Sequence, residues 1–252
     1  MGTRETKNGG PAIRIEALRK AFGEQTVLGG IDLEVARGET VTVLGRSGTG
    51  KSVLLKLIIG LQQPDAGSIQ INGEEIIKLP LDQLNELRKK IGFLFQHAAL
   101  YDSLTVEENV AFPLRRHTEL NEAERKERVQ KLLARVGMEQ DAQKMPAQIS
   151  GGMKKRVGLA RALALDPEIM LLDEPTAGLD PITAAEINKL IQELQQERQT
   201  SSIVVTHDMR SVKAVADRVA LLDEGDIKIE GTLEDLQKSD DPFVAKFMQE
   251  GC

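Results

Sequence analysis

Cysteine, tryptophan and long apolar runs are scarce or absent in this sequence of 252 residues, and each absence excludes a class of protein. The one cysteine, Cys252, cannot form a disulfide within the chain, which argues for a reducing compartment and against a cysteine metal site. No uninterrupted apolar stretch approaches about 18 residues, so no transmembrane helix is predicted. The polar start of the chain lacks the apolar core of a signal peptide. We therefore expect a cytoplasmic protein with a flexible leader over residues 1–11.

Basic residues are also fewer than acidic residues. The chain has 33 Lys and Arg against 39 Asp and Glu, a formal net charge of −6. Binding nucleic acid through its phosphates requires a basic face, so we expect no nucleic-acid partner. The remaining composition, 40% hydrophobic and 29% charged, is ordinary for a globular protein. The length suits one large α/β domain, or such a core with a helical insertion.

The stretch from Gly45 to Ser52 matches the phosphate-binding pattern G-x-x-x-x-G-K-[ST] at every fixed position. The apolar run Thr40–Leu44 before it predicts a buried strand, and Val53–Ile59 after it predicts a helix. Glycines let such a loop wrap closely around an anion, with backbone N–H groups and a positive helix end directed at it. Lys51 would reach the β- and γ-phosphates, and the Ser52 hydroxyl would ligate Mg²⁺. The nucleotide contacts are predicted at Gly45, Arg46, Ser47, Gly48, Thr49, Gly50, Lys51 and Ser52.

Polar side chains follow three further segments that predict core strands, at the ends where α/β proteins bind ligands. Asp173 is the expected carboxylate for Mg²⁺, and the adjacent Glu174 would polarise the attacking water. Gln96 can ligate Mg²⁺ and orient water, while a neutral His207 would hydrogen-bond the γ-phosphate or that water. The predicted catalytic residues are Lys51, Gln96, Glu174 and His207, and the predicted metal ligands are Ser52, Gln96 and Asp173.

A second glycine-rich helix start occurs at Ser150-Gly151-Gly152, before a helix rich in Leu and Ala. It predicts a second anion-binding helix end. One nucleotide does not need two such ends from one chain. A head-to-tail two-fold dimer resolves this, because the second end then completes the site of the other subunit. We therefore predict a homodimer.

The segments around the phosphate-binding loop predict an antiparallel part. Ala12–Leu18 and Val27–Val35 predict strands separated by a turn at Lys20–Gly23. Phe22, one of only six phenylalanines, would stack on an adenine ring from this turn; the alternative is a core role. Asn72-Gly73 predicts a tight hairpin further along.

From about Leu104 to Leu165 the pattern is almost entirely helical. Asn121 to Glu124 is typical of a capped helix start. The core resumes with a strand ending at Asp173, and a long helix is predicted from Pro181. A final hairpin around Glu224-Gly225 and a short helix over Asp240–Gln249 complete the pattern. One apolar helix face in the middle segment is predicted from Val129, Leu132, Leu133 and Val136.

Together these motifs resemble the ATPase subunits of ABC transporters, from about Ile13 to Gly231. The resemblance implies ATP and Mg²⁺ sandwiched between two subunits, with each phosphate loop facing the partner's Ser150-Gly151-Gly152 signature. It also implies nucleotide contacts for Asp180 and an adenine-stacking position for Phe22, where the family usually has tyrosine. The motifs that carry it are the phosphate loop, Gln96, the signature, Asp173-Glu174, Ala177-Gly178-Leu179-Asp180 and His207.

The same resemblance implies an α/β fold: a P-loop NTPase core with a mainly parallel sheet, an antiparallel β subdomain and an inserted α-helical subdomain. A single ABC ATPase domain would span 12–247. Its RecA-like core, with the antiparallel β subdomain, would comprise 12–96 and 167–231. The helical subdomain would comprise 97–166, and a C-terminal helical tail 232–252.

This sequence departs from the common family signature L-S-G-G-Q, and the departures resemble one group within the family. Ile149 and Met153 replace its two ends, and methionine cannot supply the hydrogen bonds of glutamine. S-G-G-M followed by basic residues is similar to ATPases of MCE-domain lipid transporters, and 109–118 resembles Mla-type phospholipid transport ATPases. This implies a homodimer on the cytoplasmic face of the inner membrane, working with an integral membrane permease and an MCE-domain protein to move phospholipid between membranes.

Three alternatives stay open. An ATPase for an amino-acid or ion importer has nearly the same core. A soluble ABC protein acting on nucleic acid or ribosomes usually carries tandem ATPase halves or long insertions, and neither is seen. A non-enzymatic nucleotide-binding regulator would not need both acids, Asp173 and Glu174.

Overall fold

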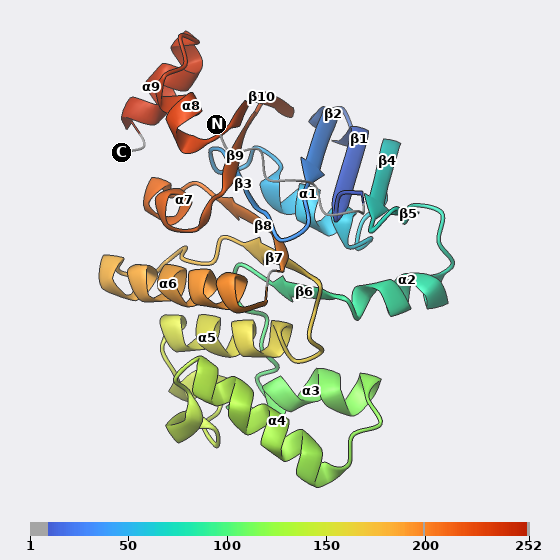
Figure 1. Cartoon of the computed structure of the whole chain (residues 1–252), viewed down its shortest axis with the longest axis vertical. Helices are drawn as coiled ribbons and strands as arrows, with labels where there is room; N and C mark the ends of the chain where they lie inside the picture. Colours follow the sequence, from blue (N-terminus) through green and yellow to red (C-terminus); the bar gives the residue numbers. More distant parts are fainter. Residues whose placement is uncertain (1–9, 199, 251–252) are drawn as a thin grey trace.

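Two sheets with helices packed around them make up the computed structural model, which describes residues 10–198 and 200–250 (Figure 1). Most of the expected leader, residues 1–9, and the cysteine at 252 lie outside the described residues. The larger sheet has six strands in the order β10-β9-β3-β8-β7-β6, all parallel except β10 at the edge. These strands are β3 (Thr40–Leu44), β6 (Ile91–Leu94), β7 (Ile169–Asp173), β8 (Ser201–Thr206), β9 (Arg218–Asp223) and β10 (Asp226–Gly231).

The central strands are buried on both faces, which is why they appear in the sequence as unbroken apolar runs. Ile203 and Val205 of β8 belong to the core shared with α1 (Lys51–Ile58), whereas Val204 between them belongs to the core shared with α5 (Gly151–Ala162) and α6 (Pro181–Arg198). Helices α1 and α5 therefore cover opposite faces of the sheet (Figure 1). The predicted mainly parallel core is confirmed.

The smaller sheet is antiparallel, in the order β2-β1-β4-β5. Asn72 and Gly73 have φ of 53° and 85°, so the predicted tight hairpin is confirmed. The turn predicted at Lys20–Gly23 is wrong, because the strand continues through Phe22, which pairs with Gln25. Only Gly23 and Glu24 turn, and the glycine supplies the positive φ of 60°. The strands are β1 (Ile13–Phe22), β2 (Gln25–Val35), β4 (Ala66–Ile71) and β5 (Glu74–Glu75).

Helices α3 (Val106–His117), α4 (Glu122–Arg135) and α5 form the inserted helical part, apart from α2 (Leu81–Arg88). Asn121 and Glu124 form the reciprocal cap predicted for α4. Its four predicted apolar positions are buried. Between α4 and α5 the chain forms only two 3₁₀ turns, Glu139–Asp141 and Pro146–Gln148, so that connection is less helical than predicted.

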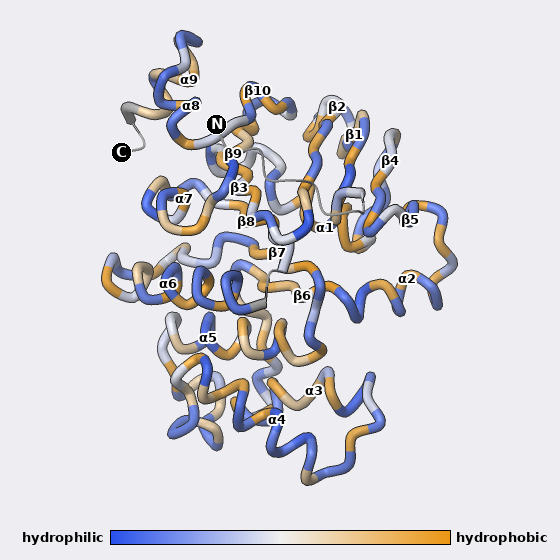
Figure 2. The backbone as a smooth tube through the Cα atoms, viewed as in Figure 1, coloured by the Kyte–Doolittle hydropathy of each residue, from blue (hydrophilic) through white to orange (hydrophobic). Residues whose placement is uncertain are grey.

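A third apolar cluster holds the C-terminal helices α7 (Met209–Val215), α8 (Leu233–Gln237) and α9 (Pro242–Glu250) against β9. In Figure 2 the outer helices alternate between hydrophilic and hydrophobic residues along their length. Within residues 10–198 and 200–250, no helix is both long and apolar enough to span a membrane.

Candidate functional site

The loop 45–50 joins β3 to α1 and is shaped by close approaches. A Cβ on Gly45 would lie 2.4 Å from the carbonyl oxygen of Leu222, so only glycine fits there. Gly50 has φ 97° at the N-cap of α1, and no side chain caps this helix. Thr49 steadies the loop by donating from Oγ1 to the Arg46 carbonyl at 2.9 Å. The first amides of α1 are thus not covered by a capping side chain, as an anion cradle requires.

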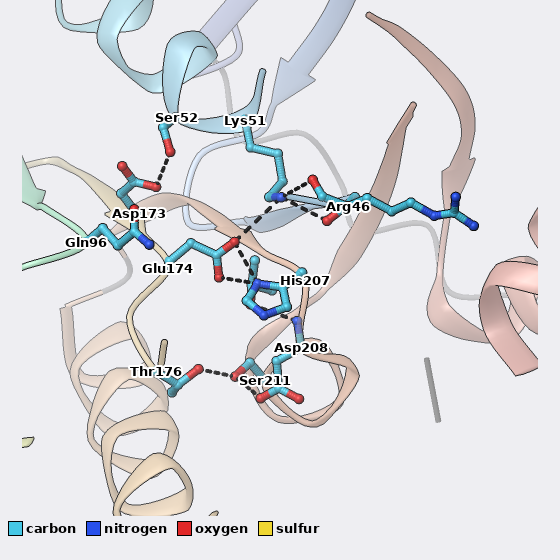
Figure 3. Close-up of polar contacts among 12 residues, drawn as sticks. Arg46, Lys51, Ser52, Gln96, Asp173, Glu174, Thr176, His207, Asp208 and Ser211 are labelled. Carbon is cyan, nitrogen blue, oxygen red and sulfur yellow. Dashed lines mark hydrogen bonds and ion pairs between the residues drawn. The ribbon is translucent and has the colours of Figure 1, made fainter. Parts of the chain in front are cut away.

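Lys51 lies buried over this loop, 5% exposed. Its Nζ donates to the carbonyl oxygens of Gly45 and Arg46, both at 2.8 Å, and lies 3.5 Å from Glu174 Oε1 (Figure 3). Burial lowers the pKa of Lys51, and the negative charge of Glu174 opposes that shift. A buried ammonium at a helix N-terminus favours an anionic ligand.

Ser52 Oγ donates to Asp173 Oδ1 at 2.7 Å, and Gln96 lies beside this pair (Figure 3). Burial raises the pKa of Asp173, so a cation there would stabilise its ionised form. Hydroxyl, carboxylate and amide oxygens are ligands that suit Mg²⁺. The described residues contain no group of three His, Cys, Asp or Glu able to hold a metal. The set Ser52, Gln96 and Asp173 offers a hydroxyl, an amide and one carboxylate, which fits a Mg²⁺ ion that would take its other ligands from phosphate and water.

Glu174 lies between Lys51 and His207 (Figure 3). Nδ1 of His207 is 3.0 Å from each carboxylate oxygen of Glu174, although the two residues are 33 positions apart. Glu174 is buried and has φ 45°, an uncommon backbone conformation that concentrates at functional sites. A carboxylate in this setting can accept a proton from water.

Lys155, which the sequence analysis did not assign, reaches the same sheet edge from α5. Its Nζ donates to the backbone carbonyls of Gln96 and Glu174, the latter at 2.8 Å. Burial lowers the pKa of Lys155 to about 8, although the negative charges of Asp173 and Glu174 act to raise it. Helical spacing could have indicated this residue, because Lys155 lies four positions before the buried Leu159 and so on the inward face of α5.

A second unpredicted group connects the segment after Glu174 with the helix after His207. Ser211 Oγ lies 2.9 Å from Thr176 Oγ1, donates to Asp208 Oδ2 at 2.9 Å, and accepts from Asn188 Nδ2 at 3.0 Å. A cleft of ≈ 520 Å³ between α6 and α7 opens beside this group. Thr176, Asn188 and Ser211 lie far apart in sequence, so no local pattern marks the contacts among them.

The signature residues do not join this cluster within one chain. Ser150 caps α5 by accepting from the Met153 amide at 3.3 Å, and Gly151 is exposed. A Cβ on Gly152 would lie 2.4 Å from Thr183 Cγ2, so this glycine is also needed for packing against α6. Because α5 and α1 cover opposite sheet faces, the two glycine-rich helix starts stay separate.

Asp180 and Phe22 also lie apart from the Lys51–Glu174 contact. Asp180 accepts from the amides of Ile182 and Thr183, both at 3.0 Å, at the start of α6. Hydrogen bonds from Thr183, chiefly that of its side chain, lower the pKa of Asp180. Phe22 is 46% exposed at the end of β1, with Lys20 Nζ 5.3 Å from its ring centroid. Their contacts with nucleotide stay predictions.

The chain matches the family model described as ABC transporter over residues 28–177. It is 42% identical over 239 residues to the probable ribonucleotide transport ATP-binding protein mkl of Mycobacterium leprae, covering 95% of this chain and 69% of that protein. It is 43% identical over 221 residues to the methionine import ATP-binding protein MetN of Brucella abortus, covering 88% and 60% respectively.

Solved structures agree with this match. The ATP-binding cassette MJ0796, in a dimeric post-hydrolysis state bound to ADP and Pi, aligns with a TM-score of 0.82 at 34% identity. The alignment covers 88% of this chain and 98% of that one. CbiO1 from Clostridium perfringens, part of the cbiONQ complex, aligns with a TM-score of 0.81 at 32% identity, covering 95% and 99%.

Proposed function

This chain belongs to the ABC transporter family and is an ATPase, and we propose that its ATP hydrolysis drives the movement of lipid, specifically phospholipid, between membranes. It acts as a homodimer on the cytoplasmic face of the inner membrane. A separate permease forms the path, and an MCE-domain protein is the lipid-binding partner.

The observation that carries the hydrolytic chemistry is the buried Glu174 carboxylate between Lys51 and His207. Lys51 binds the β- and γ-phosphates, and Glu174 accepts a proton from the attacking water. His207 holds that water or the γ-phosphate in position. Bound Mg²⁺ would neutralise phosphate charge, held by Ser52, Gln96 and Asp173.

Two features support a composite site. The exposed start of α5 lies on the sheet face opposite α1, so it is available to a second chain. A structure at 34% identity, MJ0796, is a dimer with bound ADP and Pi. A head-to-tail two-fold pairing brings Ser150, Gly151 and Gly152 of one chain to the phosphate loop of the other.

Support for the lipid cargo comes from Met153 with the basic residues after it, and from the segment 109–118. The relatives' names, ribonucleotide transport for mkl and methionine import for MetN, describe those proteins. Amino-acid import is the second candidate, favoured by the 43% identity to MetN. The match to mkl extends over 95% of this chain and that to MetN over 88%.

Purification from membranes separates the two cargoes. The tagged chain is extracted in mild detergent, and the co-purifying proteins and lipids are identified by mass spectrometry. An MCE-domain protein and a permease carrying phospholipid are the expected partners. A periplasmic solute-binding protein in their place would reject the lipid proposal and favour amino-acid import.

A further inference from the structure

One buried lysine in α5 connects the signature to the catalytic edge of the sheet. We propose that Lys155 is a positioning residue for ATP hydrolysis, which holds the backbone at Gln96 and Glu174 in register with the start of α5. The proposal rests on the composite dimer proposed above, because the start of α5 then contacts the partner's nucleotide. Lys155 thereby connects the partner's site to the hydrolytic residues of its own chain.

The connection is short and stiff. Lys155 lies five residues after Ser150, so about 7.5 Å of continuous helix separates the cap from the lysine. Its Nζ donates to the carbonyls of Gln96 and Glu174, which follow the neighbouring parallel strands β6 and β7. A shift of α5 is therefore carried by one side chain to both strand ends.

Glu174 needs such an anchor. Its φ of 45° is unfavourable for a residue with a side chain and persists only where its surroundings fix it. Its amide donates to the Val205 carbonyl at 2.9 Å, and its own carbonyl accepts from Lys155 at 2.8 Å. Both backbone polar groups of Glu174 are thus held, which orients its carboxylate toward Lys51 and His207.

Packing alone does not explain a lysine here. Lys155 is 4% exposed, and burying an ammonium is costly. In the described part of the chain, its hydrogen-bond acceptors are backbone carbonyls and not carboxylates. Methionine has a similar length and volume and would fill the same space without that cost. A lysine that only filled space could thus be replaced by methionine without any loss of activity.

The test compares Lys155→Met with Lys126→Met, which makes the same chemical change at an exposed residue of α4. For Lys155→Met we expect a melting temperature within about 4 °C of the wild type, because relief from burying the ammonium offsets the two lost hydrogen bonds. We expect unchanged ATP affinity, because the phosphate loop is untouched. We expect kcat to fall about 10²-fold, the scale of misplaced catalytic groups. We also expect the Hill coefficient for ATP to fall toward one. Lys155→Arg, which keeps donors, should recover part of kcat, and Lys126→Met should match the wild type.

Wild-type kcat and Hill coefficient in Lys155→Met would overturn the proposal. So would a joint loss of melting temperature, ATP affinity and kcat, because that marks a structural residue. Failure of the dimer is visible separately in the wild-type chain, as ATP hydrolysis by a chain that light scattering shows to be monomeric at saturating ATP and Mg²⁺. That result would overturn both the composite site and the coupling assigned to Lys155.

Discussion

Helices α1 and α5 both have glycine at their starts, Gly50 at the N-cap of α1 and Gly151-Gly152 in the first turn of α5, yet their first turns differ in what covers them. No side chain caps α1, and its first residue, Lys51, is buried beside Glu174. The start of α5 is capped by the Ser150 hydroxyl and is exposed at Gly151. Both helix ends favour negative charge, but of the two first turns only that of α1 holds a buried cation beside an acid.

This difference indicates that the two starts do different parts of one task. In the proposed function, the charged residues around α1 bind the phosphates and accept a proton from the attacking water, whereas the start of α5 contributes its backbone dipole and no catalytic group. The start of α5 therefore suits contact with a ligand that another surface already holds. Four substitutions test this division.

Lys51→Ala should have the largest effect, because it removes the buried cation from the α1 site. We expect loss of both ATP binding and turnover, measured by calorimetry and phosphate release. Lys126→Ala, on the exposed face of α4, is the matched control. Hydrolysis by Lys51→Ala at the wild-type rate would contradict the assignment of this loop.

Glu174→Gln should leave ATP binding intact and lower kcat by about 10²–10⁴-fold, the usual contribution of a general base. Because bound ATP persists, the variant should accumulate as an ATP-bound dimer in size-exclusion chromatography. Glu193→Gln, exposed on α6, controls for the loss of one charge. A Glu174→Gln chain that stays monomeric at saturating ATP and Mg²⁺ would count against the shared site.

Gly151→Asp should separate the functions of the two helix starts. Within 4 Å, a Cβ at Gly151 would contact only Leu179 Cδ2, at 3.6 Å. A carboxylate in the first turn of a helix is stabilised by the helix dipole. The fold should therefore keep its stability and the chain its ATP affinity. Turnover should fall about 10–100-fold, because the new charge repels the partner's phosphates. Ala123→Asp, in the first turn of α4, is the matched control; equal losses in both variants would contradict the role of α5.

Asn121→Ala should have the smallest effect. It removes the cap of α4, a helix outside both proposed sites, and should cost about 1 kcal/mol of unfolding free energy. The melting temperature should fall by about 2–4 °C with ATP turnover unchanged. Gln130→Ala, exposed in the middle of α4, should not lower it. A change in turnover for Asn121→Ala would show that the helical part is not independent of the site.

Elements with strong local signals could be predicted from the sequence. Thr40–Leu44 is apolar because both sheet faces are covered, and Asn72-Gly73 supplies two positive φ values. The end of β1 could not be predicted, because the pairing of Lys20 to Phe22 depends on β2. Helices α7 and α8, of 7 and 5 residues, are too short to form without tertiary packing.

Most residues of the candidate site could be predicted because they follow the ends of predicted strands. Glu174 and His207 lie at the ends of strands in the same parallel sheet, which places them within 3.0 Å despite their separation in sequence. Lys155 could not be assigned this way, because its contacts depend on how α5 packs across β6 and β7.

Mixing the Lys51→Ala and Gly151→Asp chains tests the shared site most directly. In a head-to-tail heterodimer, the intact phosphate loop of the Gly151→Asp chain faces the intact signature of the Lys51→Ala chain. Random pairing then gives about a quarter of the wild-type number of intact sites. We predict that the mixture recovers up to that fraction of ATP hydrolysis, well above the sum of the separate variants. Activity no greater than that sum would contradict the claim that α1 and α5 complete one site across two chains.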